Sequence, residues 1–421
     1  MQNQPDHRPP EPAGHEPGLA GPGIPPSPLL TAPGAVPADG PDAGVAAHYG
    51  DPFAEQRALS GALGVVDRSH RGVIRITGQD RLSWLHSLTT AALEKLASGS
   101  SAEALVLSPN GHVQFHLTLT DDGSAIWAHV EPGTAEPLVE FLESMRFMLR
   151  VESADTTPGY AVLTIMGRSE ADVRAAAAMV QPAAATERAG EPFSVDVIVE
   201  RERLADAAAE LQANGAVLGG MWACEALRIA AGRPRLGLDT DHRTIPHEVG
   251  WIGTAVQLDK GCYRGQETVA RVHNLGHPPR RLVLLHLDGS EDRLPEHGDP
   301  VTLYQPGGAQ HPLGTPQTPM ARNPPEGRQP GPENQAGPSG EGAEPGEEAA
   351  GGDIGFVGSA ARHFELGPIA LALVRRTVPV AATLLAAGVP AAQEVIVPPD
   401  AGANVKITLG RRGSLLTRPR E

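Results

Sequence analysis

Strands and helices follow one another without a fixed order through the first two thirds of the chain. Residues 72–78 and 113–119 place apolar side chains at alternate positions, which predicts strands. Asn110-Gly111 is a dipeptide typical of tight hairpin turns, so residues 104–108 and 113–119 are predicted to pair. Further strands are predicted at 125–130, 160–167 and 193–199, and helices at 80–88, 137–148, 170–180, 203–214 and 221–231. This order favours an α+β fold with antiparallel strands over a regular βαβ array.

The last third of the chain is predicted to be rich in strands. Alternating or continuous apolar runs predict these strands at 280–287, 301–304, 354–358, 369–374 and 404–409. Together they are expected to form a small barrel. Residues 305–352 interrupt it with a stretch rich in proline, glycine and glutamate, which predicts a disordered insertion.

Composition adds domain boundaries to this pattern. The 421 residues include 41 prolines and 49 glycines, concentrated near the start of the chain and in the insertion. The predicted parts are a disordered tail at 1–52, a first α+β unit at 53–155, a second at 156–277, the interrupted barrel at 278–410 and a polar tail at 411–421.

Charge and cysteine content narrow the class of protein. The formal net charge of −16 argues against a nucleic-acid or anionic membrane surface. No apolar run reaches the roughly 18 residues of a membrane span. Residues 1–50 lack a basic stretch followed by an apolar run, so they are not expected to be a secretory signal. Two cysteines do not make a disulfide framework, so we expect a cytoplasmic protein. No histidine pair stands at zinc-site spacing beside a cysteine or acid, so no stable metal is expected.

The most unusual chemistry lies in Lys260–Glu267, with the sequence KGCYRGQE. Cys262 stands between two cations, Lys260 and Arg264, and close to a possible helix start. That setting is expected to lower the pKa of the thiol and make it reactive. The alternative is a glycine-rich turn in which a small cysteine happens to fit. The other cysteine, Cys224, lies inside a predicted helix and is expected to be buried apolar filler.

KGCYRGQE, followed by Thr-Val-Ala-Arg at 268–271, resembles the signature of YgfZ-type folate-binding proteins. These are iron–sulfur cluster assembly factors related to the aminomethyltransferase (T-protein) of the glycine cleavage system. Similar agreement is found at 67–80, 227–234, 245–248 and 355–372, and the resemblance covers about 55–305 and 353–410. It implies two ferredoxin-like folate-binding units and a C-terminal β-barrel, arranged in a ring around a channel for tetrahydrofolate.

Two departures weaken the transferase interpretation. The transferases carry an aspartate pair in the hairpin, where this chain has Phe115 and His116. Proton steering in that transfer needs a carboxylate, which phenylalanine does not supply. The transferases also carry a pterin-binding glutamate two residues before the helix-ending glycine, where this chain has Ala230.

The resemblance identifies a set of candidate site residues. Cys262 is the candidate functional thiol. The candidate tetrahydrofolate contacts are Trp222, His70, Arg228, Lys260, Tyr263 and Arg264.

Most of these contacts have an alternative structural role. Trp222 is either a stacking surface or a core residue, and His70 is either a ligand contact or a capping or core residue. Tyr263 either packs under the loop or faces the channel. Lys260 and Arg264 either act on the thiol or folate, or are solvated charges.

The function expected from the resemblance is a monomeric, folate-binding accessory protein. It would serve iron–sulfur assembly or client proteins, including tRNA-modifying enzymes, through Cys262, and would not turn over a small substrate. The alternative is a folate-dependent aminomethyltransferase, and a third possibility is a folate-binding module without reactive chemistry.

Overall fold

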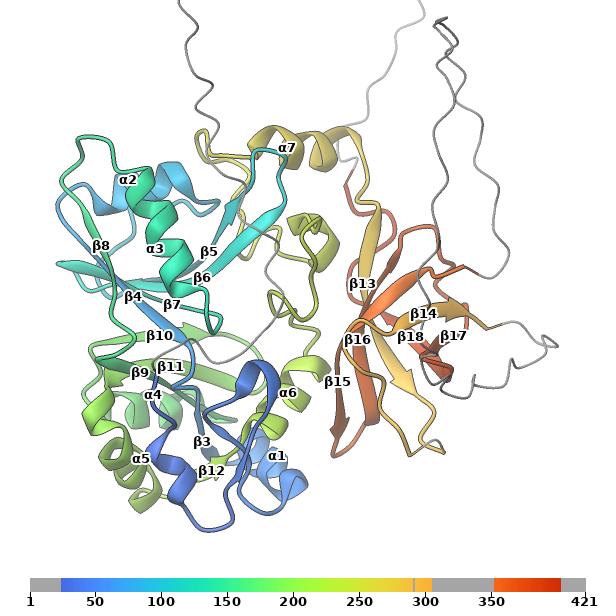
Figure 1. The fold of residues 1–421 in the computed structure, drawn as a ribbon, viewed down its shortest axis with the longest axis horizontal. Coiled ribbons are helices and arrows are strands. Elements are labelled where there is room, and N and C mark those ends of the chain that lie inside the picture. The colour runs from blue at the N-terminus through green and yellow to red at the C-terminus, as the bar shows by residue number, and fades with distance from the viewer. Residues whose placement is uncertain (1–23, 291, 305–351, 403–421) are drawn as a thin grey trace, which may run out of the picture.

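The computed structural model describes residues 24–290, 292–304 and 352–402. Two β-sheets, each with its own helices, lie beside a barrel (Figure 1). The predicted strand at 404–409, the tail at 411–421 and all but the last residue of the insertion lie outside the described residues. The mixed α+β fold with a C-terminal barrel is confirmed.

The first sheet is antiparallel throughout and has the order β5-β6-β7-β4-β8. Its strands are β4 (Gly72–Thr77), β5 (Ser101–Leu107), β6 (Val113–Asp121), β7 (Ala125–Val130) and β8 (Glu152–Asp155). Two helices, α2 (Arg81–Leu88) and α3 (Ala135–Ser144), pack on it. Ile74 and Ile76 share one face of β4 and form a buried core with Leu85, Leu138 and Leu142 of the helices.

The second sheet has the order β10-β11-β9-β3-β12. Its strands are β3 (Leu63–Asp67), β9 (Tyr160–Gly167), β10 (Ala184–Arg188), β11 (Phe193–Glu200) and β12 (Val217–Gly219). The associated helices are α1 (Pro52–Gly61), α4 (Glu170–Met179), η3 (Arg201–Arg203) and α5 (Leu204–Ala213).

The predicted division of the two units at residue 155 needs a correction. β3 pairs antiparallel with β9 and parallel with β12, so it belongs to the second sheet although it precedes the first sheet in sequence. The two units are therefore interleaved. Sequence order alone does not reveal such a pairing, because it joins strands almost one hundred residues apart.

The prediction of a disordered tail to residue 52 is wrong from residue 24 on. Residues 24–51 contain η1 (Pro28–Thr31), β1 (Val36–Pro37), η2 (Gly40–Asp42) and β2 (Ala46–His48). Leu29 is buried in the core of the second unit, and Val45 is buried against α6. A few well-placed apolar residues hold this segment despite its proline and glycine content. Residues 1–23 lie outside the described part.

The barrel closes in the order β13-β16-β15-β14-β17-β18. Its strands are β13 (Arg280–Leu287), β14 (Pro300–Leu303), β15 (Gly355–His363), β16 (Gly367–Arg375), β17 (Leu384–Ala386) and β18 (Val389–Val395). β17 and β18 are short or alternate weakly, and the apolar pattern does not predict them. Alternate residues of β13 are buried in two different hydrophobic cores. Val283 and Leu285 lie in a core with residues of β14 and β17. Leu282 and Leu284 lie in another core, with Trp251.

Three further helices connect the second sheet to the barrel: α6 (Met221–Ala230), η4 (Pro246–Val249) and α7 (Gln266–Leu275). The KGCYRGQE segment runs from a loop into α7, which crosses between the first unit and the barrel in Figure 1. None of the helices in the described ranges is long and apolar enough to cross a membrane.

Candidate functional site

The motif loop, defined here as residues 260–265, exposes Cys262 between two buried neighbours. Cys262 is a free, exposed cysteine. Lys260 and Tyr263 are only 9% and 8% exposed. The thiol therefore stands on a loop whose two sides are held in the protein.

Lys260 fixes one side of the motif loop. Its Nζ donates hydrogen bonds to the carbonyls of His86, Thr89 (2.5 Å) and Ala91 (3.1 Å), at and just beyond the end of α2. An ammonium at this end of a helix satisfies carbonyls that have no partner within the helix. Burial lowers the pKa of Lys260 to about 8. The alternative of a solvated charge at Lys260 is therefore wrong, and the predicted folate contact would have to replace these bonds.

The buried side chain of Tyr263 anchors the motif loop in a hydrophobic core. It belongs to the core that includes Trp251 and Val269, and the Nζ of Lys260 lies 5.0 Å from its ring centre. Burial raises the pKa of Tyr263 to about 12. Of the two predicted roles of Tyr263, packing under the loop agrees with this position.

Gly265 fixes the other side of the motif loop. It has φ +80°, and a Cβ there would lie 2.6 Å from the carbonyl oxygen of Ser108 and 2.9 Å from Cα of Gly111. Gly111, at the β5–β6 turn, is in turn packed against Thr268 of α7. The motif and the hairpin thus meet at a distance that leaves no room for a side chain.

Arg264 is half-buried and lies against α3. Its Cζ lies 5.5 Å from the ring centre of Phe141, and burial lowers its pKa. Both cations that flank Cys262 in sequence thus contact other groups: Lys260 contacts the end of α2, and Arg264 contacts Phe141.

A buried network of charges joins the N-terminal segment to both sheets. The carboxylate of Glu131 accepts from Arg71 (2.7 Å) and Arg235 (2.8 Å). Burial alone would raise the pKa of Glu131, but these two arginines hold it well below its usual range. Arg235 also donates to Asp42 (2.7 Å), whose carboxylate lies 3.0 Å from Nε2 of His70. His70 is 3% exposed, so the core alternative agrees with its position better than a ligand contact.

Arg228 ties α6 to the barrel. It donates to Glu225 (2.8 Å), Asp239 (2.8 Å) and the hydroxyl of Ser359 in β15 (2.6 Å). Burial works against the charge, but Glu225 and Asp239 raise the pKa of Arg228. Its predicted role as a folate contact would compete with these two carboxylates.

Trp222 lies at the start of α6 and is 55% exposed. Its ring centre lies 5.0 Å from that of His48 of β2, with the two planes tilted by 41°. The core alternative for Trp222 is therefore wrong, and the indole remains open to a ligand. Cys224, two residues further, is buried, and burial raises its pKa to about 11. This confirms the expected apolar environment of Cys224.

The two hairpin positions that replace the transferase aspartates face different surroundings. Phe115 is buried in the first core, 6.3 Å from the ring of Phe141. The ring centre of His116 lies 4.9 Å from that of Trp251, with the two planes tilted by 42°, and its Nε2 lies 3.3 Å from the carboxylate of Glu103.

Glu103 is a candidate site residue that was not predicted from the sequence. It lies on β5, diagonally opposite His116 in the hairpin register. The Asn-Gly turn signal already predicted this pairing, so the register could have located the carboxylate. Burial alone would raise the pKa of Glu103, but His116 and Arg188 lower it to about 2.

The predicted site residues occupy separate places. Lys260, Cys262, Tyr263 and Arg264 share the motif loop, His70 lies in the buried charge network, and Trp222 and Arg228 lie at opposite ends of α6. In the described part, no group of three His, Cys, Asp or Glu residues is placed to hold a metal ion.

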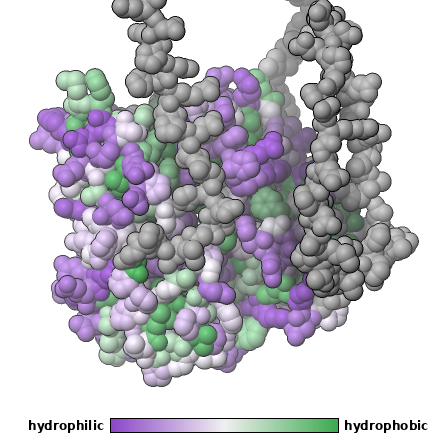
Figure 2. Space-filling view, viewed as in Figure 1, coloured by the Kyte–Doolittle hydropathy of each residue, from purple (hydrophilic) through white to green (hydrophobic). Residues whose placement is uncertain are grey.

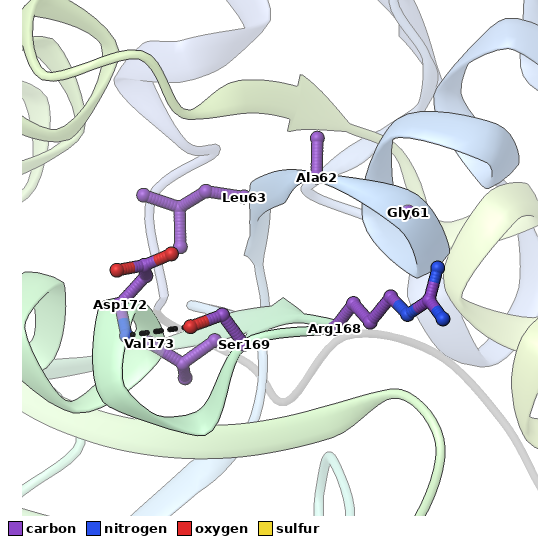
Figure 3. A pocket seen from close by; sticks show the side chains of 7 residues that line it. All are labelled: Gly61, Ala62, Leu63, Arg168, Ser169, Asp172 and Val173. Carbon is purple, nitrogen blue, oxygen red and sulfur yellow. Dashed lines mark hydrogen bonds between the residues drawn. The ribbon is translucent and has the colours of Figure 1, made fainter.

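A cleft of about 430 Å³ lies between the end of α1 and the start of α4, away from these residues. Figure 3 shows Arg168, Ser169 and Asp172 along it, with the Ser169 hydroxyl accepting from the backbone N–H of Asp172. None of the predicted site residues lines this cleft.

Residues 48–187 match the family described as the GCVT N-terminal domain. A chloroplastic protein of Arabidopsis thaliana that is named as a transferase is 28% identical over 265 residues, or 58% of this chain. The chain spans 60% of that relative, less than two thirds of its length. An aminomethyltransferase of Symbiobacterium thermophilum is 25% identical over 295 residues, covering 61% of this chain and 75% of the relative.

The fold is also that of a solved structure. The crystal structure of the glycine cleavage system aminomethyltransferase T from Bartonella henselae superposes with a TM-score of 0.66. The superposition covers 90% of this chain and 98% of the other at 16% sequence identity, so it speaks for the fold alone. Residues 48–187 are thus similar to the GCVT N-terminal domain family, and the chain has the fold of the solved aminomethyltransferase structure.

Proposed function

We propose that this chain is a folate-binding accessory protein in iron–sulfur cluster assembly or repair, with Cys262 as its working group. The observation that carries the proposal is the exposure of Cys262 on a loop held at Lys260, Tyr263 and Gly265. The YgfZ-like sequence of the loop supports the same function. The protein is expected to be cytoplasmic and to act on client proteins, including tRNA-modifying cluster enzymes.

The chemistry expected of the loop is a contact between one cysteine sulfur and a partner. Iron–sulfur clusters are held by several ligands, most often four cysteines. Cys224 is buried, so Cys262 is the one thiol that the described residues offer to solvent. A cluster that meets Cys262 therefore needs its other ligands from the partner, which favours transfer or repair over stable storage.

The proposed cofactor is tetrahydrofolate, and the residues present fit it in part. Trp222 offers an open indole face on which the pterin ring would stack. Ala230 has no group to bond the pterin, and Arg228 is already held by two carboxylates. Bound folate would supply a one-carbon carrier, while the chain's own groups would orient it. The proposal assigns Trp222 the stacking contact and assigns His70, Lys260 and Tyr263 structural roles.

A folate-dependent aminomethyltransferase remains the second candidate, because one observation favours it. Glu103 places a carboxylate 3.3 Å from His116, beside a position at which the transferases carry aspartate. A carboxylate–imidazole pair is able to accept and pass on a proton. The buried Phe115 at the neighbouring position argues against the same chemistry.

Two measurements test the proposal. Wild-type protein produced in a bacterial strain that lacks its YgfZ-type factor is expected to restore the activity of its iron–sulfur enzymes. Failure to restore it contradicts the accessory function. The glycine cleavage assay with lipoyl-bound aminomethyl group and tetrahydrofolate is expected to show no turnover, and turnover that disappears in Glu103→Gln would favour the transferase.

A further inference from the structure

The connection between α3 and β8 exposes an apolar surface that the proposed function does not use. Residues Ser144–Arg150, here called the apolar loop, are seven consecutive exposed residues between the buried Leu142 and Val151. Phe147 and Met148 are 81% and 87% exposed. Met145 (42%) and Leu149 (39%) extend the same surface. Large apolar side chains gathered in this way on a soluble protein mark an interaction site.

Helices α2 and α3 link the apolar loop to the motif loop. Phe141 of α3 carries the guanidinium of Arg264 over its ring, and α3 leads directly into the apolar loop. Trp84 of α2 donates to the carbonyl of Met145 (3.4 Å), and the end of α2 is capped by Lys260. Figure 1 places the α3–β8 connection at the outer end of the first unit, and Figure 2 shows apolar surface there. The same two helices thus support both loops.

The composition of the apolar loop indicates what it binds. It holds two arginines and no acidic residue, in a chain with a net charge of −16. Arg146 and Arg150 keep 41% and 70% of their side chains exposed while they pair with Glu143 and Asp80. Phenylalanine, methionine and arginine are enriched at the centres of protein interfaces, and lysine, which is absent here, is depleted.

We propose that the apolar loop docks the protein partner that meets Cys262, by inserting Phe147 and Met148 into an apolar pocket with an acidic rim. The identity of this partner as an iron–sulfur protein rests on the proposed function. A second copy of the chain fits less well, because a symmetric contact centred on the loop would bring arginines against arginines. An anionic membrane fits less well, because such a surface takes a cluster of about 4–8 cationic residues, and the loop has two in a chain of net charge −16.

The test compares two pairs of substitutions in the full chain. Phe147→Asp/Met148→Asp changes the apolar loop. Leu366→Asp/Val380→Asp changes two barrel residues of moderate exposure, 43% and 45%, and serves as the matched control. Both variants are expected to keep the wild-type urea unfolding curve and the wild-type rate of Cys262 reaction with Ellman's reagent. In the strain that lacks its YgfZ-type factor, the loop variant is expected to lose at least tenfold in rescued enzyme activity and the control to match wild type.

Full rescue by the loop variant overturns the proposal. If wild type itself does not rescue, the proposed function fails, and photo-crosslinking in the native host then decides the docking question. Benzoylphenylalanine at position 147 is expected to give a discrete adduct with another protein that is lost with Met148→Asp and absent from a probe at position 366. Adducts with a second copy of the chain or with lipid overturn the proposal. It is also overturned if wild type dimerises in sedimentation velocity, or binds phosphatidylglycerol vesicles, and the loop substitutions abolish that dimerisation or binding.

Discussion

Replacing Lys260 by methionine tests whether this lysine has a structural role or binds a ligand. The substitution keeps the aliphatic stem of the side chain and removes the ammonium that caps α2. Three carbonyls, those of His86, Thr89 and Ala91, lose the donor that the described structure gives them. We expect Lys260→Met to loosen the end of α2 and the motif loop together.

The expected loss of unfolding free energy in Lys260→Met follows from two opposing contributions. A hydrogen bond from a charged donor contributes about 1.5–3 kcal/mol, so three contribute roughly 5–9 kcal/mol. Burial lowers the pKa of Lys260 from its usual 10.5 to about 8. At about 1.4 kcal/mol per pKa unit, holding the charge costs roughly 3 kcal/mol. The net loss of unfolding free energy on substitution is therefore expected to be about 2–6 kcal/mol.

Urea unfolding followed by tryptophan fluorescence measures this loss, and alkylation of Cys262 by iodoacetamide reports the order of the motif loop. Lys260→Met is expected to unfold at lower urea and to be alkylated at a different rate. Tetrahydrofolate affinity, extrapolated to fully folded protein, is expected to remain unchanged. A variant as stable as wild type but with tenfold weaker folate binding would refute the structural role.

The remaining predictions concern the loop, the hairpin and the proposed folate contact. Gly265→Ala is expected to lower the free energy of unfolding by about 2–4 kcal/mol, because its Cβ would meet the β5–β6 turn. Gly253 has φ +90° but open space around it, so Gly253→Ala is expected to lower it by about 1 kcal/mol. Equal losses for the two variants in urea unfolding would contradict the close packing at Gly265. The pKa of Glu103 falls from 4.5 to about 2 on folding, so its pairing stabilises the protein above pH 4.5 and is lost as pH falls through 2. Unfolding curves across this range should therefore show wild type losing up to about 3 kcal/mol more than Glu103→Gln, and parallel losses would count against the pair. Trp222→Ala is expected to change the free energy of unfolding by no more than about 1 kcal/mol. It is expected to weaken tetrahydrofolate binding at least tenfold by calorimetry. Unchanged binding would contradict a folate contact at Trp222 and leave its ring only the contact with His48.

Local pattern was enough to predict most of the elements. The alternation at 72–78 and the Asn-Gly turn gave β4 and the β5–β6 hairpin, and the apolar runs gave four of the six barrel strands. Pairing between distant segments was not predictable in this way. β3 joins the second sheet because β9 and β12 flank it, and nothing within Leu63–Asp67 itself indicates which sheet it enters.

The candidate site shows the same division. The sequence located Cys262 and its glycines, because those residue types are informative by themselves. It did not show that Lys260 reaches across the fold to cap α2, since that contact joins residues more than 160 positions apart. Composition also misled at residues 24–51, where Leu29, Val45 and Asp42 anchor a segment rich in proline and glycine.

The exposed thiol of Cys262 is the central element of the account, and its removal in the rescue experiment tests it most directly. The measurement is the fraction of a cluster-dependent tRNA modification restored in a strain that lacks its YgfZ-type factor. Cys262→Ala is expected to restore no more modification than the empty vector. Cys224→Ala, at the buried cysteine, is expected to restore as much modification as wild type when the two are compared at equal amounts of folded protein. Restoration by Cys262→Ala to the wild-type level would contradict the account.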